Sequence, residues 1–247
     1  MITLVLLVAH IVGDFILQTD VAAHRKNASV RGLALHSLVY ATCMTCASFA
    51  LFPLRNAWIV ALALSLSHFA VDWAKAMTTR KKPERDSVVL FVFDQFLHVV
   101  AIMVLARIFQ PSAMEYAYPM GLLLEYATYE QVRATIGILL IYLVCFQPAA
   151  VFIKRLLQKP MGADSAKVSA KSTQENTGRL IGILERFTIL TLGLMGQLGA
   201  IGLIIAAKSL ARFNQLADKD FAERYLVGTL ASVLIALVCA YIGSSLV

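Results

Sequence analysis

The chain has few charged residues for its length. Asp, Glu, Lys and Arg make up 15% of its 247 residues, and 59% of the residues are hydrophobic. A soluble domain has about a quarter charged residues and about half apolar ones, so this composition excludes an ordinary soluble globular domain. The composition indicates an integral membrane protein, with the lipid bilayer as its surroundings.

Cysteines are also few, and several common catalytic motifs are absent. The four cysteines all lie in apolar runs, so they predict no disulfide framework, and the CMTC at 43–46 is expected to pack inside a helix. The chain has no GxxxxGK[ST] loop, no GxSxG elbow and no CxxCH motif. These absences argue against an ATPase, a serine hydrolase of that type and a c-type cytochrome.

Long hydrophobic runs are what the sequence has instead. A membrane-spanning helix needs about 20 mostly apolar residues. Candidate spans lie at about 2–19, 32–53, 57–76, 88–109, 134–153, 179–206 and 224–246. We therefore expect an all-α, polytopic membrane helix bundle with about seven transmembrane helices.

The connectors between these spans differ in charge. The 22 Lys and Arg residues exceed the 15 Asp and Glu residues, and most of the basic ones lie in three alternate connectors, at 20–31, 75–87 and 154–179. Basic loops stay on the cytoplasmic side, which places the N-terminus outside and explains the positive charge without a nucleic-acid partner. The sequence does not indicate a protein partner.

This pattern predicts five regions. They are a four-helix membrane core at 1–110, an outer connector at 111–133, a fifth span at 134–153, a flexible cytoplasmic linker at 154–178 and a two-helix C-terminal membrane region at 179–247. His24 is expected to be solvated in the first connector. Lys208 and Arg212 are expected to be anchors at the membrane surface opposite the cytoplasmic one.

Histidines and aspartates recur inside the first four spans. Three pairs have a spacing of four residues, namely His10 with Asp14, His68 with Asp72, and Asp94 with His98, and His36 begins the second span. Residues four apart share one face of an α-helix, so each pair can address one point. The charge-derived orientation puts all seven within a turn or two of one depth below the cytoplasmic surface, which predicts a single shared site.

Four imidazoles and three carboxylates form a ligand set for zinc, manganese or iron, and the set is too rich in nitrogen for calcium or magnesium. Seven groups exceed the needs of one tetrahedral zinc ion. They leave room for two metals with a bridging carboxylate, or for one metal and a general base. A neutral hydrogen-bonded network and a proton relay are the alternative interpretations.

Other polar residues accompany this layer. Gln18 falls one turn beyond Asp14, and Gln95 adjoins Asp94; with Lys75 and Arg186 they are candidate substrate contacts. Asp14, Asp72, Asp94 and Glu185 are the candidate catalytic carboxylates. An ordinary interhelical ion pair is the alternative for Glu185 and Arg186, and surface exposure is the alternative for Lys75.

Several motifs, in this order, resemble a known family. AHIVGDFILQTD, LHSLVY, SHFAVDWAK, FDQFLH, GRLIGILERF, AAKSLARF and AERYLVGTLAS together are similar to the bacterial membrane proteins of the domain of unknown function 3307 family. The resemblance implies a bacterial inner-membrane protein without an established activity. The His/Asp helices are also loosely similar to membrane-bound metal-dependent hydrolases, which is an analogy only.

Two functional classes follow from these residues, with a third that is purely structural. The first is an intramembrane metal-dependent hydrolase of a lipid-linked or phosphorylated substrate, a lipid or a small molecule, entering from the cytoplasmic leaflet. The second is a transporter of metal ions or of coupled protons, although the first four spans have no second ionisable layer and no internal repeat. The third is an assembly subunit whose polar network packs against a partner.

Overall fold

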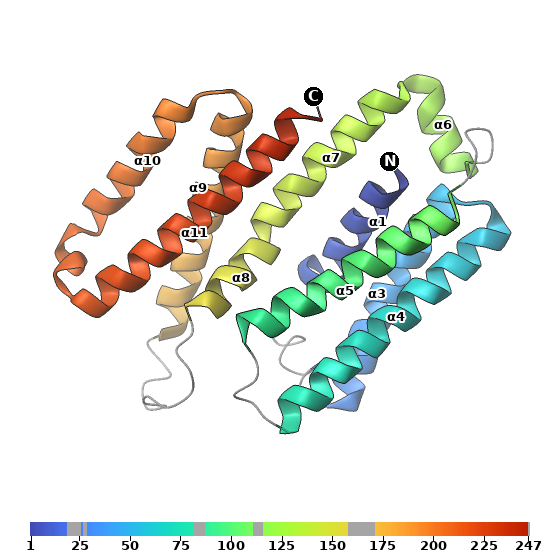
Figure 1. Cartoon of the computed structure of the whole chain (residues 1–247), viewed down its shortest axis with the longest axis horizontal. Coiled ribbons are helices and arrows are strands. Elements are labelled where there is room, and N and C mark those ends of the chain that lie inside the picture. The colour runs from blue at the N-terminus through green and yellow to red at the C-terminus, as the bar shows by residue number, and fades with distance from the viewer. Residues whose placement is uncertain (19–25, 27–28, 82–86, 111–115, 158–170, 247) are drawn as a thin grey trace. The chain divides into compact units, whose positions relative to one another are not determined.

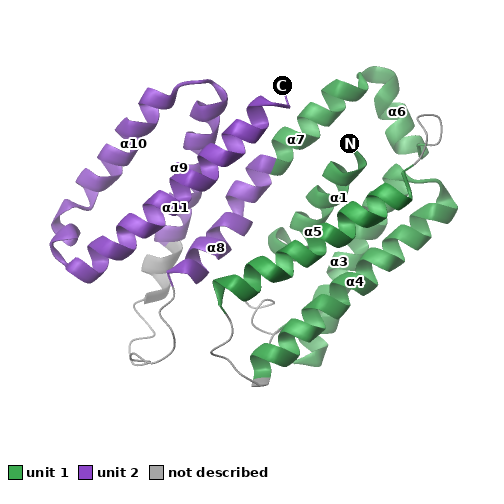
Figure 2. Cartoon of the chain, in the orientation of Figure 1, with its two compact units in different colours: residues 1–140 green, residues 141–247 purple. Residues whose placement is uncertain are grey.

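The computed structural model describes residues 1–18, 26, 29–81, 87–110, 116–157 and 171–246. In these residues all regular structure is helical, and the chain divides into two compact units, Met1–Leu140 and Ile141–Val247 (Figure 2). His24 and residues 158–170 of the predicted linker lie outside the described residues. The all-α class predicted from the sequence is therefore confirmed.

Unit 1 contains the four helical segments that carry histidine and aspartate. Its elements are α1 (Ile2–Ile11), the π-helix η1 (Val12–Ile16), α3 (Val30–Leu51), α4 (Leu54–Lys81), α5 (Val88–Ile108), α6 (Tyr118–Tyr126) and most of α7 (Tyr129–Phe146), as Figure 1 shows. Ser29 and Ser87 immediately precede α3 and α5 as N-caps. Their hydroxyls accept hydrogen bonds from the backbone N–H groups of Gly32 and Leu90. Such caps satisfy donors that a helix start leaves without partners.

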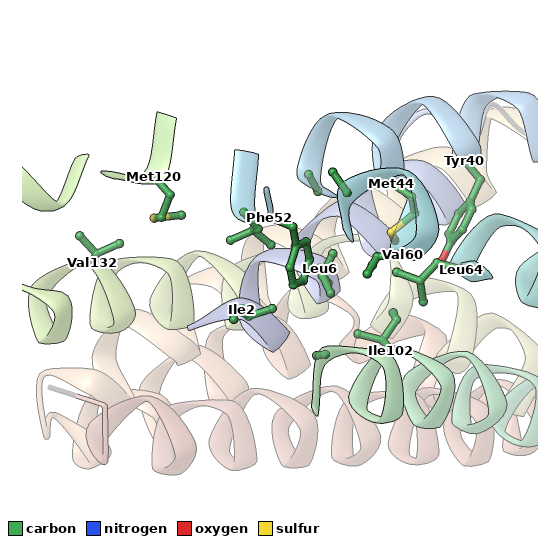
Figure 3. Packing of buried hydrophobic residues seen from close by; sticks show 14 residues of the cluster. Ile2, Leu6, Tyr40, Met44, Phe52, Val60, Leu64, Ile102, Met120 and Val132 are labelled. Atoms are coloured by element: carbon green, nitrogen blue, oxygen red, sulfur yellow. The ribbon is translucent and has the colours of Figure 1, made fainter. Parts of the chain in front are cut away.

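A hydrophobic core packs one part of this bundle. It includes Ile2 and Leu6 of α1, Met44 of α3, Leu64 of α4 and Ile102 of α5 (Figure 3). On α1 and α4 the His/Asp residues follow the core residues along the chain. On α3 and α5 they precede them, as expected of helices that alternate in direction. The apolar core and the polar layer are therefore two successive levels of one packed bundle.

The outer surface of these helices is apolar while their polar residues are buried. On α5, Asp94 and His98 are buried, whereas Val89, Phe93 and Phe96 are exposed. Five helical segments are long and apolar enough to cross a membrane, namely Val30–Leu51, Leu54–Arg80, Val88–Ile108, Tyr129–Leu156 and Lys219–Ser244. The chain is thus a multi-pass membrane protein, since water would not favour this inverted arrangement.

The first and fifth predicted spans differ in length in the structure. The first, at 2–19, is a short apolar helical segment, Ile2–Ile16. The fifth, at 134–153, is longer than predicted, because α7 begins at Tyr129, inside the predicted outer connector, and continues as α8 (Pro148–Leu156). Proline at the start of α8 cannot donate a backbone hydrogen bond, which accounts for the break after Phe146.

Unit 2 contains α8, α9 (Lys171–Leu194), α10 (Leu198–Ala211), the 3-10 helix η3 (Phe213–Ala217) and α11 (Lys219–Ser244). The prediction of one continuous span at 179–206 is wrong, because α9 ends at Leu194 and α10 begins at Leu198. Gly196 lies in this turn with φ 72°, a left-handed conformation that glycine adopts at little cost. The predicted linker also ends before residue 178, since α9 begins at Lys171.

The helix α10 runs back along α9. Ile189 and Ile201 share one buried cluster, and the ammonium group of Lys208 donates to Glu185 at 2.5 Å. The sequence suggested that Lys208 is an anchor at the membrane surface opposite Glu185. Its ion pair with Glu185 contradicts that position. The prediction was wrong because it took 179–206 as one straight helix and so placed Lys208 beyond its far end.

Candidate metal centre

All seven predicted His/Asp residues are buried, and all lie in unit 1. Six of them form two groups of metal-ligand side chains, and within each group the ligand atoms lie within 4.8 Å of one another. The first group is Asp14, His36, His68 and Asp72, and the second is Asp72, Asp94 and His98. Asp72 belongs to both groups.

The first group brings residues from η1, α3 and α4 to one point. His36 Nε2 lies 3.1 Å from His68 Nε2, 3.2 Å from Asp14 Oδ1 and 3.3 Å from Asp72 Oδ2. His68 Nε2 lies 3.1 Å from Asp72 Oδ2 and 3.9 Å from Asp14 Oδ1. A tetrahedral zinc site with bonds of about 2.0–2.1 Å has ligand–ligand edges of about 3.3 Å. The donor set and its spacing therefore suit one tetrahedral cation.

The second group brings α4 and α5 together. His98 Nε2 lies 3.9 Å from Asp72 Oδ1 and 3.8 Å from Asp94 Oδ1. These three buried atoms make no hydrogen bond within the described part of the chain. Buried polar atoms without partners are costly, and a cation among them would supply the missing interaction. Asp72 directs Oδ2 to the first group and Oδ1 to the second, as a bridging carboxylate would.

His10 lies beside these groups but belongs to neither. Its Nδ1 lies 3.3 Å from the Tyr40 hydroxyl, and its Nε2 lies 3.1 Å from Gln95 Oε1. The expectation that His10 and Asp14 address one point assumed α-helical geometry. The chain instead forms the π-helix η1, where Leu17 N–H bonds to Val12 five residues back, and this wider turn changes the face to which Asp14 belongs.

Gly13 allows η1 to approach α3 closely. A Cβ atom at Gly13 would lie 3.2 Å from Tyr40 Cα and 3.2 Å from Tyr40 Cδ2. The approach seats Asp14 against His36, one turn before Tyr40 on the same face of α3. The Tyr40 ring also stacks on the His68 ring at 3.5 Å, so this tyrosine holds two histidines in place. Its four-residue spacing from His36 is the sequence signal that would have identified it.

Lys26 is a second site residue, besides Tyr40, that the sequence did not identify. Its Nζ is buried at 2.7 Å from Asp72 Oδ2, 3.3 Å from Asp14 Oδ1 and 3.0 Å from His36 Nε2. Burial alone lowers the pKa of Lys26, but the charges of Asp14 and Asp72 outweigh that effect and raise the pKa to about 12. In the sequence, Lys26 is distinguished only as one positive charge of the basic connector 20–31.

The predicted substrate contacts near the cluster have definite partners in two cases. Gln95 donates to Asp14 Oδ2 at 3.0 Å and to Asp94 Oδ2 at 3.2 Å, so it links the two groups. Lys75 does not extend to the surface but pairs with Asp94 Oδ2 at 2.7 Å. The amide nitrogen of Gln18 is buried and makes no hydrogen bond within the described residues.

Glu185 and Arg186 lie in unit 2 and belong to neither ligand group. Glu185 pairs with Lys208, as described above. The Arg186 guanidinium donates to the carbonyl of Cys145 at 2.7 Å, to that of Phe146 at 3.4 Å and to the Ser232 hydroxyl at 3.4 Å. Those carbonyls stand at the end of α7, where the helix leaves acceptors without partners, so Arg186 caps that helix.

Comparison with known proteins supplies the last observation. Neither curated proteins nor solved structures give a match. The family model described as "Protein of unknown function (DUF3307)" matches residues 2–124, a stretch that includes all seven His/Asp residues and Lys26. The motifs after residue 124 that resembled the family lie beyond the match. The chain belongs to the DUF3307 family.

Proposed function

We propose that this protein is an intramembrane metalloenzyme that hydrolyses a lipid-linked substrate. Its buried His/Asp cluster would hold one or two divalent ions of zinc, manganese or iron. The observation that carries the proposal is Asp72, whose two oxygens face two converging groups of buried donors. A purely structural polar network would be expected to satisfy its own buried atoms, whereas Asp94 Oδ1 and His98 Nε2 have no hydrogen bond to any residue that the structure describes.

The residues divide into roles on this proposal. Asp14, His36, His68 and Asp72 hold the first ion, and Asp72, Asp94 and His98 hold the second. Metal ions in such sites activate water and polarise the bond to be broken, and paired ions about 3.5–4 Å apart are common in hydrolases. With one ion only, Asp94 and His98 would be available as general base. Gln95 and Tyr40 orient the ligands through their hydrogen bonds and ring contact.

The proposed setting is a bacterial inner membrane, with the N-terminus outside and the site near the cytoplasmic face. Arg80 of the basic connector 75–87 donates to the backbone carbonyl of Lys26, in the basic connector 20–31, at 3.3 Å. Both connectors therefore lie on the same side as the cluster, which supports this orientation. A single cysteine at Thr128 should react with an impermeant maleimide added outside cells, and one at Lys154 should not. The reverse labelling pattern would contradict the orientation.

Metal analysis of detergent-purified protein tests the proposed function. We expect one or two equivalents of transition metal in the natural protein and a loss in both Asp14→Ala and His68→Ala, with the exposed Asp220→Asn as the matched control. Lipid phosphates and lipid esters are then screened as substrates of the metal-loaded protein. Absence of metal from folded protein would overturn the proposal. Metal flux into liposomes without hydrolysis would replace the enzyme with a transporter.

A further inference from the structure

Lys26 lies against the same atoms that would bind the first metal ion. Its Nζ contacts three of the four donors of that group, namely Asp14, His36 and Asp72, and its side chain is 10% exposed. An exposed lysine near a metal site would be ordinary. A buried lysine bonded to the ligand atoms themselves requires an explanation, because a cation and an ammonium group need the same partners.

The His36 nitrogen makes this competition unavoidable. An ammonium group only donates hydrogen bonds, so in its 3.0 Å contact with Lys26 the His36 Nε2 atom is the acceptor. An imidazole nitrogen has one lone pair, and a metal ion requires that lone pair to bind. The bond from Lys26 to His36 and a bond from His36 to a metal therefore exclude each other.

Charge adds to the competition. Lys26 Nζ lies 2.7 Å from Asp72 Oδ2, the oxygen that also lies within 3.3 Å of His36 and 3.1 Å of His68. A metal ion bound among these donors would therefore lie very close to the ammonium group. Two positive charges at such a separation repel strongly where little water screens them.

We propose that Lys26 is a built-in competitor for the first metal position, and that metal binds only by displacing its ammonium group from His36 and Asp72. The inference rests on the metal binding proposed above. It assigns Lys26 a further role in the empty site, where its charge compensates Asp14 and Asp72, so that the carboxylates are neutralised before and after metal enters. The apparent metal affinity is then set by the difference between the binding free energies of the metal ion and of the Lys26 ammonium group at this position.

Zinc affinity of Lys26 variants tests this inference. Apparent dissociation constants are measured by competition with a chromogenic chelator for the natural protein, Lys26→Met and Lys26→Arg. Lys26→Met keeps most of the chain length and removes the charge, so we expect zinc to bind roughly tenfold to a hundredfold more tightly. Lys26→Arg keeps the charge and should bind zinc within about threefold of the natural protein. Equal affinity of the natural protein and Lys26→Met would overturn the inference and leave the metal site intact.

Labelling of the unaltered protein provides a test that needs no variant. A water-soluble amine-acylating reagent is applied with and without zinc, and modification of Lys26 is quantified by mass spectrometry against the exposed Lys154. We expect zinc to increase labelling of Lys26 at least threefold, and magnesium, which suits this nitrogen-rich set poorly, to leave it unchanged. Zinc that binds without changing Lys26 labelling contradicts the displacement. Protein that binds none of zinc, manganese and iron overturns the proposed function itself.

Discussion

The two units both bury charged side chains within their helices, but they do so in different ways. In unit 2 the charges have individual partners, with Lys208 for Glu185 and helix-end carbonyls for Arg186. In unit 1, three carboxylates and three histidines converge, and several of their atoms have no hydrogen bond within the described residues. A buried charge alone therefore does not indicate a functional site. Convergence of several donors with unused bonding capacity does.

Replacing Asp72 should have the largest effect on this contrast, because Asp72 alone belongs to both ligand groups. We expect Asp72→Asn to lower bound metal by at least tenfold and to remove any hydrolytic activity. Asp94→Asn should lose only the second ion and keep about one equivalent. Plasma mass spectrometry of both purified variants checks this, and equal metal content in the two would refute a bridging role for Asp72.

Arg186→Met should affect stability but not metal. The variant leaves carbonyl groups at the end of α7 without their donor, which we expect to cost about 2–3 kcal/mol and to lower the melting temperature by several degrees. Bound metal per folded protein should stay within about 20% of that of the natural protein, because substitutions at distant, independent sites have little effect on each other. Thermal unfolding in detergent, paired with metal analysis, separates the two quantities. Loss of metal from folded Arg186→Met would show that the units act as one site.

Gly13→Ala should have an intermediate effect on unit 1. The added methyl group would meet the Tyr40 backbone at 3.2 Å, so η1 must move away from α3 and carry Asp14 with it. We expect metal affinity to fall by roughly tenfold and stability by about 1–3 kcal/mol. Gly202→Ala on α10 is the matched control, since no atom of the described residues lies within 4 Å of its added Cβ. Unchanged metal affinity in Gly13→Ala would mean that the close approach does not position Asp14.

The smallest effect is expected at His10. Both of its ring nitrogens already have partners in Tyr40 and Gln95, so we expect His10→Gln to retain metal content and to weaken metal affinity by no more than about tenfold through misplaced neighbours. His68→Gln is the comparison variant, and it should lose the first ion. If His10→Gln loses metal as completely as His68→Gln, then His10 is itself a metal ligand and belongs to the first group.

The sequence was sufficient to locate most of the candidate site. Ionisable residues are rare in apolar helices, and a spacing of four residues places each pair on one helix face, so His68 with Asp72 and Asp94 with His98 could be paired without a structure. The orientation that the basic connectors indicate then places these residues of different helices at a common depth. Both inferences depend on local periodicity and on composition, which a linear chain displays directly.

Three features could not be inferred in that way. Helical spacing alone gives no sign of the π-helix that contains Asp14, in which Gly13 packs closely against α3. The turn at Gly196 divides a run that is apolar enough to look continuous. Lys26 belongs to a connector, and its side-chain direction depends on where the three neighbouring helices place their carboxylates.

By itself, the sequence determined that this is a helical membrane protein and which seven residues are anomalous within its spans, because hydropathy and helical period are local properties. Only the tertiary structure decided that six of those residues form two groups sharing Asp72, that His10 stands beside them, and that Lys26 contacts the first group. Those outcomes depend on distances between atoms of different helices. Such distances are set by packing, through the closest approach that residues such as Gly13 and Tyr40 allow.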